Sequence, residues 1–179
     1  MPEHDRLERD ILPHLPAAYT LARWITGNRS DAEDVVQEAV IRAMRSLAGF
    51  RGDHGRAWVL TIVRNTAYTW LQRQRTKESP LMGHDVPDPA ERAIAPDAAM
   101  ITDERRQVLR RALAQLAPPY REALVLREVE GLSYQEIATM VQAPIGTVMS
   151  RLSRAREQLA RLVCCDPAAD DLHREGARA

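Results

Sequence analysis

The sequence predicts an all-α fold in which two small helical domains are joined by an acidic, proline-rich linker. Apolar residues recur at every third or fourth position in both halves of the 179-residue chain, which is typical of helices. No stretch of useful length shows the alternation of a strand. Residues 79–100 contain four prolines and little periodicity. We therefore expect domains at 6–78 and 103–163, a flexible linker at 79–102 and a disordered tail at 164–179.

The first domain contains a helix that begins with a capping signal. Ser30 is followed three residues later by Glu33, which predicts a capping box with Ser30 as the cap. The helix should end near Ala48-Gly49. Its expected apolar stripe consists of Val35, Val36, Ala39, Val40, Ala43, Met44 and Leu47.

A loop and a long helix follow. The segment "FRGDHG", from Phe50 to Gly55, holds two glycines and an aspartate, which favours a loop. A helix is then predicted from about Arg56 to Arg75. Its apolar stripe consists of Val59, Ile62, Val63 and Leu71.

The second domain begins near Thr102 with another helix, which should end at Pro118-Pro119. Its expected apolar stripe consists of Val108, Leu109, Ala112, Leu113 and Leu116. A helix that Gly131 terminates comes next, and Ser133 with Glu136 predicts a second capping box. The short helix after it should turn Ile137, Ala138 and Met140 inward.

The last predicted helix has two unlike faces and follows a break at Ala143-Pro144. One face carries apolar residues at helical spacing, namely Ile145, Val148, Leu152, Ala155 and Leu159. The opposite face carries hydroxyls and guanidiniums. Two helices joined by a tight turn, the second basic outward, are typical of a helix-turn-helix motif whose second helix enters the major groove of DNA. The alternative is an ordinary solvated helix in a small bundle.

The charges are balanced overall and segregated locally. The chain has 25 basic and 25 acidic residues. Residues 51–78 hold six basic and two acidic side chains, whereas 80–103 hold five acidic and one basic. The basic segments suit a polyanionic partner.

Several classes of protein are disfavoured. No apolar run approaches the roughly 20 residues that span a bilayer, and the N-terminus is charged, so we expect a cytoplasmic protein without membrane insertion. The adjacent Cys164 and Cys165 and five scattered histidines lack ligand spacing, so no metal or cofactor is expected. We find no nucleophile–base pair and no phosphate-binding glycine loop, and therefore expect no enzyme and no catalytic residues.

Two segments resemble a known family. "GLSYQEIATMVQAPIGTVMSRLSRAREQL", residues 131–159, resembles domain 4 of bacterial RNA polymerase sigma factors. "DAEDVVQEAVIRAMRSLAGFRGDHGRAWVLTIVRNTA", residues 31–67, resembles domain 2. The short layout of domain 2, linker and domain 4 is similar to the extracytoplasmic-function (ECF) group. The resemblance implies a transcription initiation factor that binds core polymerase and helps to open promoters.

The resemblance also implies a role for each segment. The face that would hold the polymerase clamp helices comprises Asp31, Glu33, Asp34, Gln37, Glu38 and Arg42. The −10 element would be read by Phe50, Arg51, Gly52, Asp53, His54, Gly55, Arg64, Asn65 and Arg73. A flipped base needs a pocket and its backbone needs cations. Each acidic residue could equally belong to a plain solvated face, and Trp58 fits a packed core aromatic better than a DNA contact.

Contacts to the −35 element would come from the last helix, through Gly146, Thr147, Ser150, Arg151, Ser153 and Arg154. Met149 stands where many relatives carry an arginine, so one phosphate or base contact is in doubt.

The expected partners are core RNA polymerase, through its clamp helices and flap, promoter DNA, and an anti-sigma factor; we expect a monomer. Two alternatives remain at this point. One is a helix-turn-helix regulator that acts without polymerase, and the other is an adaptor that sequesters an anti-sigma factor.

Overall fold

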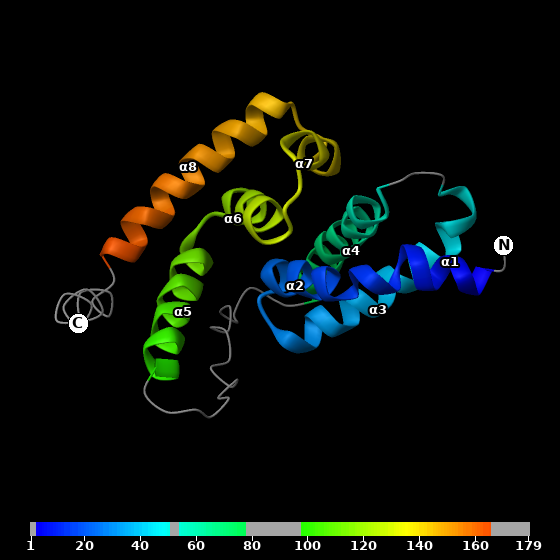
Figure 1. Ribbon diagram of the computed structural model, residues 1–179, viewed down its shortest axis with the longest axis horizontal. Coiled ribbons are helices and arrows are strands. Elements are labelled where there is room, and N and C mark those ends of the chain that lie inside the picture. Colours follow the sequence, from blue (N-terminus) through cyan, green and yellow to red (C-terminus); the bar gives the residue numbers. More distant parts are fainter. Residues whose placement is uncertain (1–2, 51–53, 78–97, 166–179) are drawn as a thin grey trace.

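A computed structural model describes residues 3–50, 54–77 and 98–165, and this part of the chain is helical without a strand. The described residues form an N-terminal body, residues 3–77, and a C-terminal body, residues 98–165 (Figure 1). The all-α fold with two helical bodies is confirmed. Most of the predicted linker and tail lies outside the described residues.

Three long helices form the N-terminal body and pack on one another. α2, α3 and α4 are in mutual contact, and α1 precedes them. The elements are α1 (Glu3–Asp10), η1 (Leu12–His14), α2 (Leu15–Thr26), α3 (Arg29–Ser46), η2 (Leu47–Gly49) and α4 (Gly55–Lys77). The fully buried side chains at its centre include Leu21, Val35 and Leu60.

The start of α3 differs from the predicted capping box. The cap is Asn28, whose Oδ1 accepts a hydrogen bond of 2.8 Å from the Asp31 backbone N–H. Asn28 Nδ2 also donates to Asp31 Oδ2 at 2.7 Å. Glu33 pairs with Arg29 at 2.9 Å instead of reaching back to a cap. The prediction was wrong because α2 ends at the left-handed Gly27, φ 86°, which places Asn28 at the start of the next helix.

The C-terminal body places a helix-turn-helix beside two supporting helices. It contains α5 (Ala98–Gln115), α6 (Pro118–Leu124), the π-helical turn η3 (Val125–Val129), α7 (Tyr134–Val141) and α8 (Ile145–Cys164). α8 packs on α5, α6 and α7. Its buried face consists of Val148, Leu152 and Ala155, as the spacing predicted.

The predicted capping box of α7 is confirmed. Ser133 Oγ accepts a hydrogen bond of 3.2 Å from the Glu136 N–H. Glu136 Oε2 accepts one of 2.8 Å from the Ser133 N–H. Hydrogen bonds from Ser133 hold the pKa of Glu136 below its ordinary value.

Replacing Ser133 with alanine is expected to lower the free energy of unfolding by about 1 kcal/mol, because one N–H at the start of α7 loses its partner. Urea unfolding followed by circular dichroism measures the change. Ser153→Ala, on the exposed face of α8, is the matched control and should leave the midpoint unchanged. Equal midpoints for wild type and Ser133→Ala would contradict the role of the cap.

Three residues of the predicted apolar stripes lie at the surface. Met44 is 48% exposed, Leu109 is 44% exposed and Ile145 is 44% exposed. Each stripe is therefore narrower than its spacing suggested. A helix that packs at one flank buries a narrow stripe, and the residues beside that stripe stay in solvent.

The two bodies touch through the helices that precede α8. α2 contacts α6 and η3, and α4 contacts α7, so α6 and α7 lie between α8 and the N-terminal body (Figure 1). Buried residues of both bodies belong to one continuous apolar cluster. This arrangement, in which the two bodies are in contact, places the N-terminal part of α4 against the C-terminal body.

Candidate nucleic-acid interface

The outer face of α8 presents the residues predicted to read a major groove. Gly146, Ser150, Ser153 and Arg154 are exposed, and Thr147 and Arg151 are half-buried. Ser150 Oγ donates to the Thr147 carbonyl at 2.9 Å, which holds this hydroxyl on the helix surface. All six predicted residues therefore lie on one helix within three turns, with Gly146, Ser150, Ser153 and Arg154 away from the buried apolar face and Arg151 at its flank.

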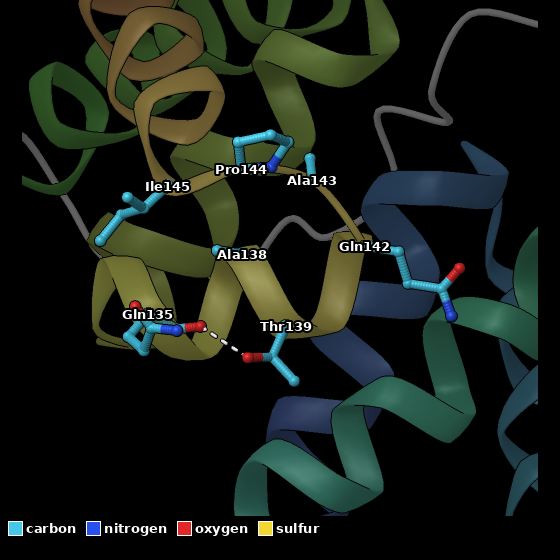
Figure 2. A pocket seen from close by; sticks show the side chains of 7 residues that line it. All are labelled: Gln135, Ala138, Thr139, Gln142, Ala143, Pro144 and Ile145. Carbon is cyan, nitrogen blue, oxygen red and sulfur yellow. Dashed lines mark hydrogen bonds between the residues drawn. The ribbon is translucent and has the colours of Figure 1, made fainter.

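The turn between α7 and α8 sets the angle of the recognition helix. Gln142 adopts a left-handed conformation, φ 53°, and ends α7, while Pro144 precedes the first residue of α8. Pro144 has an extended ψ of 143°, which stops α7 from continuing into α8. A shallow hollow lies at this turn, lined by Gln135, Ala138, Thr139, Gln142, Ala143, Pro144 and Ile145 (Figure 2). Thr139 Oγ1 donates to the Gln135 carbonyl at 3.0 Å along its wall.

Only part of the predicted −10 loop is described. Phe50 stacks on Trp58 with ring centroids 4.4 Å apart, and the Phe50 carbonyl accepts a hydrogen bond of 2.7 Å from Arg6. Trp58 is half-buried and packs on the core, as the interpretation as a core aromatic predicted. Arg51, Gly52 and Asp53 lie outside the described residues.

The start of α4 lies beside α1 and η1. A Cβ added to Gly55 would lie 3.4 Å from both the Asp10 carbonyl oxygen of α1 and His14 Nε2 of η1, which is ordinary van der Waals contact. His54, just before it, has a side chain that is 79% exposed, and its Nδ1 lies 3.9 Å from Glu136 Oε1.

Arg64 makes the densest set of polar contacts among the predicted −10 residues. Its Nε donates to Glu122 Oε1 at 2.7 Å, and its Nη2 lies 3.4 Å from Glu122 Oε2. Nη1 donates to Asn65 Oδ1 at 3.3 Å, and the guanidinium lies over the Tyr68 ring, 4.8 Å from its centroid. Burial and the negative charge of Glu122 raise the pKa of Tyr68 to about 12. Arg64 therefore faces the C-terminal body.

Arg73 lies more than two turns beyond Arg64 on α4, where its charge acts on Glu38 of α3. The hydrogen bond from Arg42 lowers the pKa of Glu38, and the charges of Arg45 and Arg73 contribute further. Arg73 is exposed near the C-terminal end of α4. The structure thus brings Arg64 and Asn65 together and sets Arg73 apart from them.

The predicted polymerase-binding face lies on α3. Glu33, Asp34 and Gln37 are exposed, and Arg42 Nε donates to Glu38 Oε1 at 2.8 Å. Asp31 is engaged at the helix start by Asn28. Ile41, 45% exposed, and Met44 add apolar surface to the same helix. The face is therefore acidic with an apolar C-terminal end, and Met44, which the spacing assigned to the buried stripe, belongs to it.

Sequence reasoning missed four residues at the contact between the bodies: Arg56, Tyr68, Glu122 and Glu130. Arg56 Nη2 lies 2.5 Å from Glu130 Oε2, and both glutamates are almost fully buried. Within helices so rich in charge, a glutamate that turns inward carries no local signal. The inward orientation of these glutamates is visible only in the folded structure. There Glu122 meets Arg64, 58 residues away in the chain, and Glu130 meets Arg56, 74 residues away.

Among the described residues, no group of three metal-ligating side chains comes together, and no helix is long and apolar enough to cross a membrane. Cys164 and Cys165 are unbonded and exposed at the end of α8.

Comparison with known proteins identifies the family. The model described as Sigma-70 region 2 matches residues 11–77, and the one described as Sigma-70, region 4 matches residues 106–159. The chain is also 42% identical over 137 residues to the RNA polymerase sigma-H factor of Pseudomonas aeruginosa, covering 72% of this chain and 71% of the relative. The chain belongs to the sigma-70 family of RNA polymerase sigma factors.

Two further similarities place this sigma factor within the family. It is 40% identical over 137 residues to the ECF RNA polymerase sigma-E factor of Escherichia coli, covering 72% of each chain. The solved structure of the sigma factor RpoE in complex with the anti-sigma factor NepR from Bartonella quintana aligns with a TM-score of 0.71 and 28% identity. The alignment covers 89% of this chain and 98% of that one. The predicted ECF membership is confirmed.

In this sigma factor the two matched regions coincide with the two bodies. Region 2 contains the α3 face and the α4 residues described above, and region 4 contains the helix-turn-helix. The predicted helix-turn-helix of α7 and α8 therefore lies where the family model for region 4 matches.

Proposed function

We propose that this ECF sigma factor directs core RNA polymerase to its promoters by reading two DNA elements, one with each body. The observation that carries the proposal is α8, whose buried apolar face seats it on α5, α6 and α7 and leaves a hydroxyl- and arginine-bearing face outward. A helix in that setting fits the major groove of B-DNA. We assign it to the −35 element through Gly146, Thr147, Ser150, Arg151, Ser153 and Arg154.

The −10 element is assigned to the loop and α4. The Phe50–Trp58 stack supplies an aromatic surface beside the loop, and Arg64 with Asn65 supplies a donor pair along α4. Aromatic surfaces and cations are what an unpaired DNA strand requires. Arg51, Gly52 and Asp53 belong to the same assignment from sequence alone, together with His54.

The α3 face is assigned to core polymerase. Its exposed Glu33, Asp34 and Gln37 continue into the apolar Ile41 and Met44. A mixed acidic and apolar helix face left in solvent favours a protein partner over a nucleic acid, because phosphates would be repelled.

We propose control by an anti-sigma factor that holds both bodies. The support is the alignment with a sigma factor solved in complex with the anti-sigma factor NepR, which extends over 89% of this chain. The protein would act with the polymerase in the cytoplasm as a monomer, and the polymerase would perform all covalent chemistry.

Run-off transcription tests the function. Core polymerase with this sigma factor should produce discrete transcripts from promoters of its own genome, because the sigma factor alone confers promoter recognition on core. A gel shift without core is the control, since a regulator that acts alone would bind a duplex site at similar concentrations. Absence of transcripts on every genomic template, or strong duplex binding without core, would contradict the proposal.

A further inference from the structure

Two arginines of α4 and a histidine just before this helix each face a glutamate of the C-terminal body. Arg64 pairs with Glu122 of α6 at 2.7 Å. Arg56 pairs with Glu130, which follows η3, at 2.5 Å. His54 lies 3.9 Å from Glu136 of α7. The bodies therefore meet through two arginine–glutamate pairs whose members are more than 50 residues apart in the chain.

The burial of these groups is unequal. The side chains of Glu122 and Glu130 are only 4% and 3% exposed, whereas those of Arg64 and Arg56 are 19% and 44% exposed. A buried carboxylate is costly unless it is paired, and here the pairing groups come from the other body. Tyr68 of α4 also hydrogen-bonds Glu122.

The balance of such a contact is delicate. Burying two ions costs desolvation energy that their attraction only partly offsets, so the net gain of a buried pair over separated, hydrated ions is small. If the bodies separate, both carboxylates return to water. The charge contact can therefore hold the bodies together and still be displaced by a competing anion.

A DNA phosphate is such a competitor. Guanidinium groups bind carboxylates and phosphates through the same donors, in the same planar geometry. Arg64 is assigned to the −10 element, so its donors cannot serve Glu122 and a phosphate at once. Arg56 lies two turns earlier on the same helix, with nearly half of its side chain exposed.

We propose that Glu122 and Glu130 act as an internal substitute for promoter phosphates, holding the free sigma factor closed, and that Arg56 is a further DNA-contacting residue released with Arg64. The inference rests on the assignment of α4 to the −10 element. In the free protein, Arg64 and Arg56 pair with Glu122 and Glu130. In the opened protein, the two arginines bind DNA phosphates instead.

The test compares the full-length wild type with the Glu122→Gln/Glu130→Gln double variant. Small-angle X-ray scattering of the free proteins should give a larger radius of gyration for the double variant. Its affinity for a fluorescein-labelled single-stranded oligothymidylate should rise by about tenfold, as expected if closed molecules outnumber open ones by about ten to one in the wild type.

Glu128→Gln is the matched control. Glu128 lies in η3, between the two glutamates in sequence, but its side chain is 52% exposed and pairs with Arg156 of α8, 2.6 Å away. This variant should retain the wild-type radius and affinity. Unchanged values in the double variant, or the same change in Glu128→Gln, would overturn the proposal.

Arg56→Gln provides a second route should the double variant fold poorly, which circular dichroism would reveal. This variant should also have a larger radius of gyration than the wild type. Its affinity for the oligonucleotide should rise less than that of the double variant, because the substitution removes a phosphate donor together with the Arg56–Glu130 pair. A compact Arg56→Gln protein, or one with the full gain in affinity, would also count against the proposal. Run-off transcription by the wild type with core separates this proposal from the proposed function. If the wild type supports transcription but the double variant keeps the wild-type radius and affinity, only the role of Glu122 and Glu130 is refuted.

Discussion

Replacing Leu152 with alanine is expected to lower the free energy of unfolding by about 2–5 kcal/mol. Leu152 is 1% exposed and lies at the centre of the buried face of α8. Its removal leaves a cavity between α8 and the helices on which it packs. Such a loss is a large part of the total stability of a small protein. Urea unfolding, followed by circular dichroism, measures it.

Met149→Ala is the control for this prediction. Met149 is on the same helix but 52% exposed, so its truncation should change the free energy of unfolding by no more than about 0.5 kcal/mol. Similar losses in the two variants would mean that α8 does not pack through the face containing Leu152.

Replacing Ser150 with aspartate is expected to reduce transcription from a promoter with a −35 element by about tenfold or more. Ser150 is exposed on the outer face of α8, so the change leaves the core intact. A carboxylate there would meet DNA phosphates or base acceptors, and the loss of one good contact costs about 1–3 kcal/mol. Run-off transcription and filter binding of the complete polymerase measure the effect.

Gln158→Asp is the matched control, because it adds the same charge at an exposed position two turns further along α8, beyond the assigned residues. Its transcription should stay within about twofold of the wild type. Equal loss in both variants would indicate a general charge effect, and no loss in Ser150→Asp would remove this face from DNA recognition.

The helices and their buried faces could be predicted where local chemistry decides them. The Ser133–Glu136 capping box and the buried residues Val148 and Leu152 follow from spacing within a few residues. The cap of α3 was misassigned because Asn28 and Ser30, two residues apart, are both residue types that cap helices, and the left-handed Gly27 decides for Asn28. The burial of Met44, Leu109 and Ile145 was predicted wrongly because the width of a buried stripe depends on which other helices pack on it. The spacing within one helix does not identify those helices.

The candidate interface, too, could be predicted from the sequence only in part. The outer face of α8 is local, since its residues share one helix and one orientation. The pairs Arg56–Glu130 and Arg64–Glu122 depend on how two bodies meet, and each residue looks like an ordinary surface charge in isolation. The resemblance placed Arg64 in a promoter-contacting stretch, but only the fold shows which carboxylate it faces.

The stack of Phe50 on Trp58 has a consequence for how this protein could be observed at work. An indole that rests against another ring beside the loop assigned to the −10 element responds in its fluorescence to any rearrangement there. Trp24 lies on α2 and Trp70 further along α4, so a version with phenylalanine at those two positions would leave Trp58 as the one tryptophan, beside the loop. The fluorescence emission of Trp58 would then report the proposed binding of a displaced base in real time, without an added dye.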